Sequence, residues 1–217
     1  MTEAAAAVPA RRPRGRPRKP PEAQDEGNRR QELLHAAARL FRQKGFAATT
    51  TRDIAAAAGM RSGSPFYHFE NKAALLFAVM EQGMRAALQI QATALQAVPP
   101  EAAPDARLRT LVRAHFDVLL GAGSDFIPVM LYEWRSLSAA QRAGIARLQR
   151  QYEDAWADTL QALAAAGRVQ ADAHIARLMM LGALNWSVQW YKPKKGASLD
   201  DLCDQAMQLF APQRRPR

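Results

Sequence analysis

The sequence predicts an all-α protein, in which three short N-terminal helices precede a domain of roughly six longer helices. Three observations support this fold class. Apolar residues recur every three or four positions along most of the chain, which is the period of a helix that buries one face. Good N-cap residues and glycine stops divide this pattern into separate helices. No segment alternates convincingly between apolar and polar residues, as a half-buried strand would.

The composition is that of a folded globular protein with a basic surplus. The 217 residues are 48% hydrophobic and 23% charged, which is enough to bury a core and excludes a fully disordered chain. Lys and Arg number 30 against 20 Asp and Glu, and the resulting charge of +10 favours a polyanionic partner.

Cysteine usage and hydropathy exclude several other classes. Cys203 is the single cysteine, so a disulfide scaffold and a thiolate zinc site are excluded, and a reducing compartment fits. No apolar run reaches the roughly 18 residues that a membrane helix needs, and the N-terminus lacks the apolar core of a signal peptide. We therefore expect a cytoplasmic, nucleoid-associated protein with no membrane partner.

Residues 1–28 are predicted to be a disordered arm, and residues 212–217 a disordered basic tail. The arm has no apolar period, and its prolines remove backbone donors. Residues 11–20 contain six basic residues and no acid, which is typical of phosphate binding. The alternative is a solvated tail that only keeps the protein soluble.

The next segment contains the start and stop signals of short helices. Asn28 is a good N-cap for a first helix that ends at Gly45. Thr50 and Asp53 have the spacing of a capping box, and they start a second helix. Gly59 then stands where a left-handed C-cap is expected.

Further helices follow with similar signals. Ser62 caps a third helix that ends near Phe69, and Asn71 caps a fourth that runs from Lys72 toward Leu95. The remaining helices are expected near residues 105–121, 125–136, 138–166, 173–191 and 198–210.

Two short helices joined by a tight Gly59-Met60-Arg61 turn form a helix-turn-helix pattern. The second of these helices, Ser62 to His68, would fit the major groove, where base edges are distinguishable. Its first residues are small, so the backbone could approach the bases closely. The alternative is a helical hairpin of a larger bundle that has no role in DNA binding.

Residues 29–80 also carry a specific combination of residues. It comprises Leu33, Leu34, Ala37, Leu40, Phe41, Lys44-Gly45-Phe46, Thr49 to Ala55, Ala58-Gly59-Met60, Gly63 to Lys72, Leu75 and Leu76. This combination resembles the N-terminal domain of TetR-family transcription regulators. The resemblance implies an all-helical fold of nine or ten helices, with a DNA-binding domain over residues 29–75. It also implies an effector-binding and dimerisation domain over residues 76–211.

The resemblance implies DNA contacts at the matching positions. Phosphate contacts are implied for Thr50, Thr51, Tyr67, His68 and Lys72, and base contacts for Arg52, Arg61, Ser62 and Ser64. Phe66, where the family often has Tyr, would offer an apolar contact to thymine methyl groups. Pro65 replaces a usual Leu, so the first turn of the reading helix departs from the family pattern.

The segment from Pro13 to Pro20 resembles an AT-hook. Arg14, Gly15 and Arg16 would lie in the minor groove, because narrow A·T-rich grooves attract arginines and glycine lets the backbone approach the groove floor. The alternative is a plain basic tail.

The C-terminal part is rich in aromatic residues and Met, which suggests a large apolar cavity between helices. The expected effector pocket consists of Phe116, Phe126, Met130, Trp134, Trp156, Met179, Asn185 and Trp186. The alternative for each of these residues is ordinary core packing. The expected dimer interface consists of Leu178, Leu181, Leu199, Leu202, Met207 and Leu209.

Residues 184–193 resemble the end of the penultimate helix in a TetR subgroup whose members often respond to acyl-CoA thioesters. Such a ligand would need an apolar tunnel and cationic groups for its phosphates. The candidate cations are Arg135, Lys192, Lys194 and Lys195.

The predicted function is that of a ligand-responsive transcription regulator, most simply a repressor. It would bind a palindromic operator as a homodimer and be released by a small apolar or acyl-CoA-type effector. The alternatives are an architectural protein of A·T-rich DNA and a TetR-like activator. An enzyme is not expected, because the four histidines are scattered, and no cofactor or metal is expected either.

Overall fold

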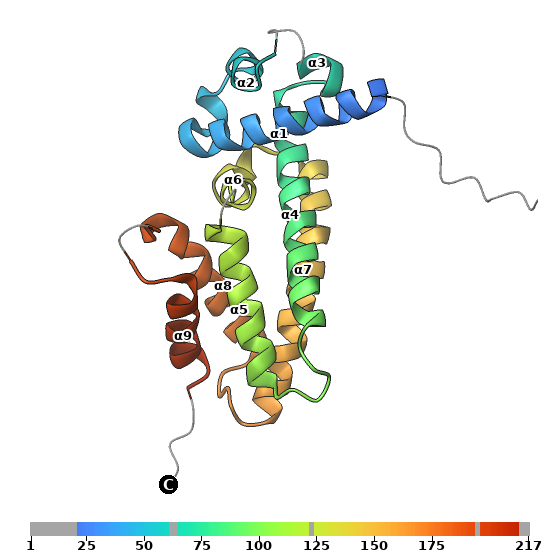
Figure 1. Ribbon diagram of the computed structural model, residues 1–217. Helices are drawn as coiled ribbons and strands as arrows, with labels where there is room; N and C mark the ends of the chain where they lie inside the picture. The colour runs from blue at the N-terminus through green and yellow to red at the C-terminus, as the bar shows by residue number, and fades with distance from the viewer. Residues whose placement is uncertain (1–20, 61–64, 122–123, 194–195, 213–217) are drawn as a thin grey trace, which may run out of the picture.

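The computed structural model describes residues 21–60, 65–121, 124–193 and 196–212, with only the backbone described for residues 21–26 and 65–66. Within these ranges the chain forms nine α-helices and one 3₁₀ helix, with no strand, so the predicted all-α class is confirmed (Figure 1). The elements are α1 (Pro21–Ala48), α2 (Thr51–Ala57), α3 (Pro65–His68), α4 (Lys72–Gln96), α5 (Pro104–Leu120), α6 (Phe126–Glu133), η1 (Trp134–Ser136), α7 (Ala139–Ala165), α8 (Ala173–Trp190) and α9 (Leu199–Phe210).

The molecule is an elongated bundle with a small head at one end. Helices α1 to α3 form the head, and α4 runs from the head down the length of the body beside α7 (Figure 1). The short helix α6 lies between α1 and the body, and α9 lies along the outside of α5 (Figure 1). Because α4 packs against α1, α5, α6 and α7, it connects the head to most of the body.

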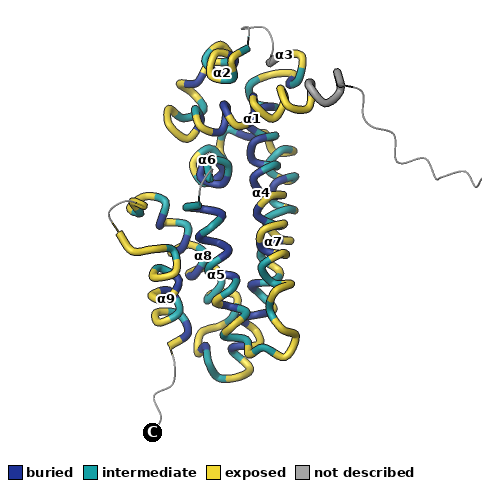
Figure 2. Tube along the Cα trace, viewed as in Figure 1, coloured by how far each residue is buried: buried dark blue, intermediate teal, exposed yellow. Residues whose placement is uncertain are grey.

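The head and the body share one apolar core. Phe41 of α1, Leu76 of α4 and Trp156 of α7 are all buried members of this cluster. On α7, one face is buried, and it consists of Ile145, Tyr152, Trp156, Leu160 and Leu163. Exposed residues concentrate on the outer faces of the head and of α8 and α9 (Figure 2).

The N-caps predicted at Thr50 and Asn71 are confirmed, and side-chain caps also begin α7, α8 and α9. Capping boxes begin α2, α7 and α9, at Thr50, Ser138 and Ser198. Asn71 and Asp172 each accept a hydrogen bond from a backbone N–H three residues further on. These local bonds satisfy N–H groups that would otherwise lack a partner, which is why the sequence signals them reliably.

The first and third helices differ from the prediction. Helix α1 begins at Pro21 rather than after Asn28, so the predicted arm overlaps this helix from Pro21 onward. Proline is favoured in a first helical turn, which agrees with a start at Pro21. Helix α3 is described only from Pro65 to His68, and the predicted cap Ser62 lies outside the described residues.

The left-handed backbone of Gly59 in the head predicts the effect of a substitution there. Gly59 has a φ of +67°, and a Cβ atom there would meet nothing within 4 Å, so any cost of Gly59→Ala comes from the backbone alone. We expect this change to lower the free energy of unfolding by about 1–2 kcal/mol, the cost of a side chain in the left-handed region. The measurement is urea unfolding followed by circular dichroism.

The matched control is Gly27→Ala. Gly27 is an exposed helical residue of α1 with equally open surroundings. Alanine is the better helix former there, so the free energy of unfolding should rise by about 0.5 kcal/mol. Equal effects of the two changes would contradict the assignment of the cost at Gly59 to its left-handed backbone.

Candidate functional site: the DNA-binding head and an internal cavity

The start of α2 presents three of the predicted DNA-contacting residues. The Thr50 hydroxyl accepts a hydrogen bond from the Asp53 N–H at 3.1 Å, and the Thr50 N–H donates to the Asp53 carboxylate at 3.0 Å. These hydrogen bonds lower the pKa of Asp53. Thr50 and Arg52 are exposed and Thr51 is partly exposed, so all three are accessible to a bound duplex.

Helix α3 presents Tyr67, whose side chain is 90% exposed. His68 is half-buried, and Phe69 is buried in the core. The Arg30 guanidinium lies 5.0 Å from the centre of the Phe69 ring, which fixes the end of α3 against α1. Because Phe69 is held in the core, the neighbouring Tyr67 side chain points outward from a fixed position and is accessible to a partner.

Lys72 has a structural role that the sequence did not reveal. Its ammonium group donates to the carbonyl oxygens of Phe46 at 2.7 Å and Thr49 at 2.8 Å, and it lies 4.3 Å from the centre of the Phe46 ring. The first residue of α4 therefore holds the end of α1 and the approach to α2. Its implied phosphate contact stays a prediction.

The other predicted DNA-contacting groups fall where the structure gives no placement. Arg14, Gly15, Arg16, Arg61, Ser62, Ser64 and the side chain of Phe66 lie outside the described residues.

Helix α6 joins the body to the head. The Phe46 N–H donates to the Glu133 carboxylate at 2.8 Å, and the same carboxylate accepts from the Ser136 hydroxyl. Arg42 of α1 forms an ion pair with Asp125 at 2.9 Å. Sequence reasoning missed these contacts because the partners lie more than 80 residues apart and have no local signal.

Helices α4 and α6 approach each other unusually closely. A Cβ atom at Gly83 of α4 would lie 2.8 Å from the Cβ atom of Phe126, so only glycine fits without displacing α6. The rings of Phe126 and His35 make an edge contact, with centroids 5.1 Å apart. A shift of either helix is therefore transmitted to α1.

A cavity of about 80 Å³ lies inside the body between α4, α5, α6, α7 and α8. One part of its wall is apolar, and the other carries polar side chains. The wall consists of Met84, Ala87, His115, Val118, Ile127, Met130, Gln149, Tyr152, Glu153, Leu181 and Asn185.

A buried hydrogen-bonded network forms the polar wall. His115 Nδ1 lies 2.9 Å from the Tyr152 hydroxyl, and His115 Nε2 lies 3.2 Å from Asn185 Oδ1. Burial lowers the pKa of His115 to about 4, so the imidazole is neutral at pH 7. Burial also raises the pKa of Tyr152.

The network continues away from the cavity. Gln91 donates to the backbone oxygen of Tyr152 at 3.0 Å and accepts from the Trp156 indole N–H at 3.0 Å. Each of these buried polar groups therefore has a partner, which fixes the positions of the side chains on the cavity wall.

The structure divides the predicted pocket residues into three groups. Met130 and Asn185 line the cavity, and Phe126 lines an adjoining groove of about 260 Å³. Phe116 and Trp156 are core residues, and Trp134 is half-buried against the core.

Two of the predicted pocket residues are elsewhere. Met179 and Trp186 are 68% and 65% exposed, and neither lines the cavity in this chain. Both faces of α8 are apolar, and these two residues lie on the face that points away from the core.

The predicted dimer residues also fall into an exposed group and a group that packs within the chain. Leu178 and Leu209 are exposed, whereas Leu199, Leu202 and Met207 pack against the core of the same chain. Leu181 is half-buried and lines the cavity. An exposed apolar face nevertheless runs along α8, and it consists of Ile175, Leu178, Met179, Trp186 and Trp190.

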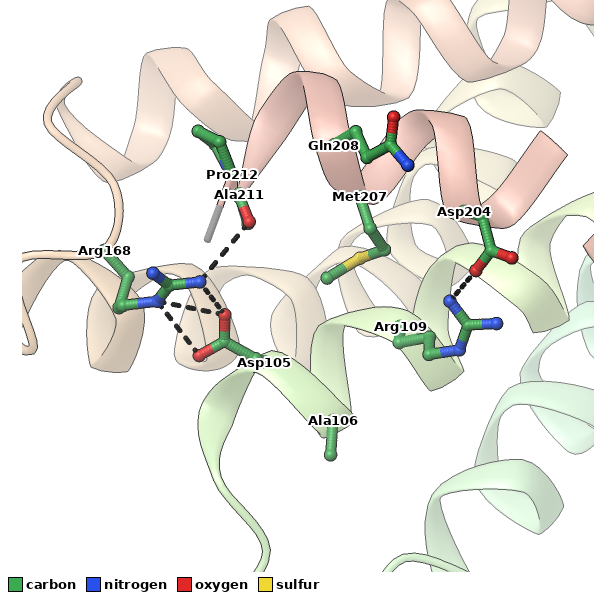
Figure 3. A pocket seen from close by; sticks show the side chains of 9 residues that line it. All are labelled: Asp105, Ala106, Arg109, Arg168, Asp204, Met207, Gln208, Ala211 and Pro212. Atoms are coloured by element: carbon green, nitrogen blue, oxygen red, sulfur yellow. Dashed lines mark hydrogen bonds and ion pairs between the residues drawn. The ribbon is translucent and has the colours of Figure 1, made fainter. Parts of the chain in front are cut away.

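A larger groove, of about 550 Å³, lies between α5 and α9 and is lined by charged residues (Figure 3). Arg168 binds Asp105 at 2.6 Å, and Arg109 pairs with Asp204. Since these charges are already engaged with one another, the groove suits the attachment of α9 better than it suits a ligand.

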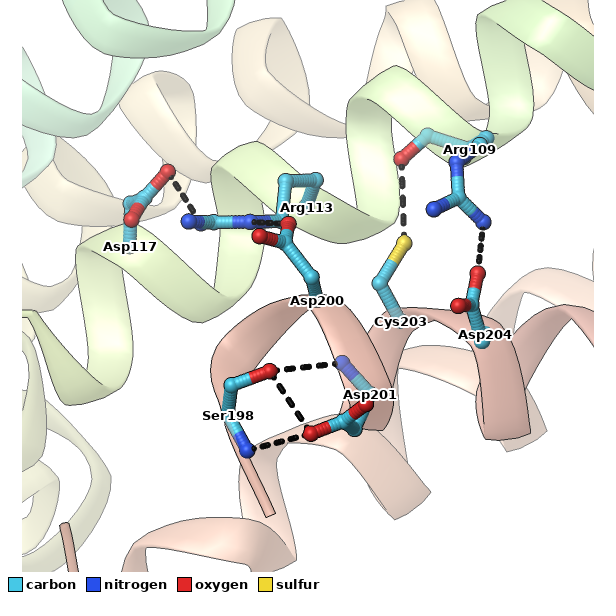
Figure 4. Close-up of polar contacts among 8 residues, drawn as sticks. All are labelled: Arg109, Arg113, Asp117, Ser198, Asp200, Asp201, Cys203 and Asp204. Carbon is cyan, nitrogen blue, oxygen red and sulfur yellow. Dashed lines mark hydrogen bonds and ion pairs between the residues drawn. The ribbon is translucent and has the colours of Figure 1, made fainter.

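The α5–α9 contact has further polar links (Figure 4). Arg113 pairs with Asp200 at 2.6 Å, and the Cys203 thiol donates to the Arg109 carbonyl at 3.5 Å. Burial raises the pKa of Cys203, which therefore acts as a packing residue rather than as a thiolate.

Thus the chain combines an exposed helix-turn-helix head with a helical body that encloses a cavity. This arrangement defines a class of DNA-binding regulators that respond to a ligand.

Comparison with known proteins agrees with this class. The family of bacterial regulatory proteins called tetR matches residues 33–79, and the tetracyclin repressor-like C-terminal domain matches residues 101–212. The chain belongs to the TetR family of transcription regulators, as the sequence resemblance implied. Members of this family are regulators rather than enzymes, so this protein is not an enzyme.

Two repressors and one solved structure are similar to this chain over most of its length. The transcriptional repressor KstR2 of Rhodococcus jostii is 28% identical over 88% of this chain and 94% of its own length. KstR2 of Mycobacterium tuberculosis is 30% identical over 76% of this chain and 82% of its own length. The crystal structure of AibR in complex with isovaleryl coenzyme A and operator DNA is 26% identical, with a TM-score of 0.77 over 85% of this chain and 98% of that one.

Within the described part of the chain, no helix is long and apolar enough to cross a bilayer.

The buried imidazole predicts a pH dependence of stability. The unfolded chain protonates His115 near its ordinary pKa of 6.5, whereas the folded chain does so only near pH 4. The free energy of unfolding should therefore fall as the pH is lowered through this window, by up to about 1.4 kcal/mol per pH unit. His115→Gln should make this slope shallower in urea unfolding at several pH values.

Gln91→Leu is the matched control. It breaks the same buried network but leaves His115 in place, so it should lower stability and keep the slope. An unchanged slope in His115→Gln would show that this imidazole does not cause the pH dependence.

Proposed function

We propose that this protein is a repressor that binds a palindromic operator as a homodimer and leaves it when an acyl-CoA-type effector enters the cavity. The observation that carries the proposal is that the two helices that line one side of the cavity, α4 and α6, are also the helices that hold the head. The AibR complex, which contains both an acyl-CoA and operator DNA, supports the effector class.

A single helix, either α4 or α6, reaches from the cavity to the head. Ile127 and Met130 of α6 line the cavity, and Glu133 of the same helix holds the Phe46 N–H. On α4, Met84 lines the cavity, while Lys72 holds the end of α1. A ligand that displaces either helix would change the orientation of the head, and linkage then requires that DNA weakens binding of that ligand.

DNA binding would use the exposed residues of α2 and α3 in the major groove. Thr50, Thr51, Tyr67 and His68 would contact phosphates, and Arg52 would reach a base. The AT-hook-like arm would add minor-groove contacts from Arg14, Gly15 and Arg16. A regulator of this kind would act at the nucleoid.

The homodimer would pair the exposed apolar face of α8 with the same face of a second copy. Trp186, Trp190 and Met179 are large apolar side chains of the kind that dominate interfaces. A twofold dimer then presents two heads to two half-sites of a palindrome.

The phosphates of a coenzyme A would require cations outside the cavity. Arg135 and Lys192 are exposed and available, whereas Lys194 and Lys195 lie outside the described residues. The effector is a ligand of regulation rather than a cofactor.

An activator would share all of these features, because the sign of regulation depends on operator position. An architectural protein of A·T-rich DNA would instead bind without a palindrome and without any response to an effector.

The test is a genome-wide footprint of the purified protein, followed by titration of the bound operator with isovaleryl-CoA. A palindromic site that is released by the thioester supports the proposal. A ligand that saturates the protein but leaves operator affinity unchanged would contradict it.

Removing the arm should weaken operator binding. Deletion of residues 1–20 removes six basic residues, so the slope of log K against log salt should become shallower by about 0.9 unit for each phosphate that the shortened protein no longer neutralises. Fluorescence anisotropy at several salt concentrations measures both quantities. Deletion of residues 1–10, which contain no Lys or Arg, is the control and should keep the slope. Equal slopes for both deletions would remove the arm from DNA binding.

Placing a charge on the α8 face should dissociate the dimer. Trp186→Glu should weaken dimerisation at least about 30-fold, the ratio that corresponds to about 2 kcal/mol. Sedimentation equilibrium gives the dissociation constant. Gln161→Glu, at an exposed position of α7, is the control and should stay dimeric. A wild-type protein that is monomeric at micromolar concentration would refute the proposed dimer.

A further inference from the structure

We propose that the part of the effector that enters the cavity is a short, uncharged acyl group, and that its carbonyl oxygen accepts a hydrogen bond from the Asn185 carboxamide. This inference rests on the proposed function, because it specifies the ligand chemistry of the same cavity.

The buried network orients Asn185. Its Oδ1 faces His115 Nε2 at 3.2 Å, and an amide oxygen can only accept, so Nε2 carries the imidazole proton. His115 Nδ1 then accepts from the Tyr152 hydroxyl, which completes the hydrogen bonds of a neutral imidazole. With its oxygen engaged, Asn185 is left with an amide N–H₂ group to offer to a ligand.

The amide N–H₂ group of Asn185 belongs to a residue that lines the cavity. Asn185 is a partly buried residue of the wall, and its amide nitrogen has no hydrogen-bond partner among the described residues. The same wall contains apolar side chains, among them Met84, Ile127 and Met130. A ligand that is apolar and carries one hydrogen-bond acceptor therefore matches the wall.

The charges on the wall exclude a free acid. Among the described residues that line the cavity, Glu153 is the only one with a formal charge, and it forms an ion pair with Arg177. His115 is neutral. A ligand carboxylate would meet one carboxylate and no free cation, which is costly in a desolvated site. A thioester carbonyl carries no formal charge and avoids this cost.

The volume limits the size of the acyl group. An engineered apolar cavity of about 150 Å³ binds benzene. The cavity here is about 80 Å³, so it takes a group smaller than a benzene ring. A branched acyl chain of a few carbons fits this limit better than a ring system does.

The experiment compares two ligands that differ only at the carbonyl. Isobutyryl-CoA, whose acyl group has fewer non-hydrogen atoms than benzene, is the thioester, and 2-methylpropyl-CoA is the thioether with CH₂ in place of C=O. We expect isothermal titration calorimetry to show that the full-length protein binds the thioester about 10-fold more tightly, as the loss of one buried hydrogen bond implies. Asn185→Leu should bring this ratio close to one and change affinity for the thioether much less.

Asn185→Asp is a second variant of nearly the same shape. It removes the donor and adds a negative charge that repels a carbonyl oxygen, so it should also abolish the preference if Asn185→Leu fails to fold. Gln149→Leu is the matched control, because it removes the other carboxamide of the wall and should preserve the 10-fold ratio. Circular dichroism confirms that each variant is folded.

The outcomes separate this inference from the proposed function. Equal binding of thioester and thioether by the wild-type protein overturns the inference and leaves an acyl-CoA effector in place. A collapse of the ratio in Gln149→Leu rather than in the Asn185 variants overturns the assignment to Asn185. Failure of the wild-type protein to bind either ligand overturns the acyl-CoA effector and this inference together.

Discussion

The apolar core shared by the head and the body is the constraint on which the rest of the structure depends. Leu75, Leu76 and Val79 of α4 are buried in the same cluster as Leu33 and Phe41 of α1. Because side chains in such a core interdigitate at close-packed density, the head cannot turn without a rearrangement of α4. The head is therefore not a separate rigid unit, and a movement of α4 in the body would change the orientation of the head.

Within this core, the His115 network is a polar exception. An imidazole, a phenol and two carboxamides are buried together, and each bond in the chain from Asn185 to Trp156 satisfies a group that would be costly if left alone. The network fixes α5, α7 and α8 relative to one another at the level of the cavity.

Much of the fold could be predicted from the sequence because its signals are local. The caps at Thr50, Asn71 and Ser138 depend on residues three positions apart, and the left-handed turn at Gly59 depends on one residue. The site was less predictable. Helix α8 is apolar on more than one face, so its sequence placed both Asn185 and Trp186 in the pocket, whereas only Asn185 lines the cavity and Trp186 is exposed. The contact from Glu133 to the Phe46 N–H has no pattern at all, since only tertiary folding brings the two together.

The close approach of α4 and α6 at Gly83 has a consequence for the orientation of the head. The atom that glycine lacks would occupy the space now filled by Phe126 and would drive the two helices apart. A methyl group at that position would therefore change the angle between the body and the head without any ligand in the cavity.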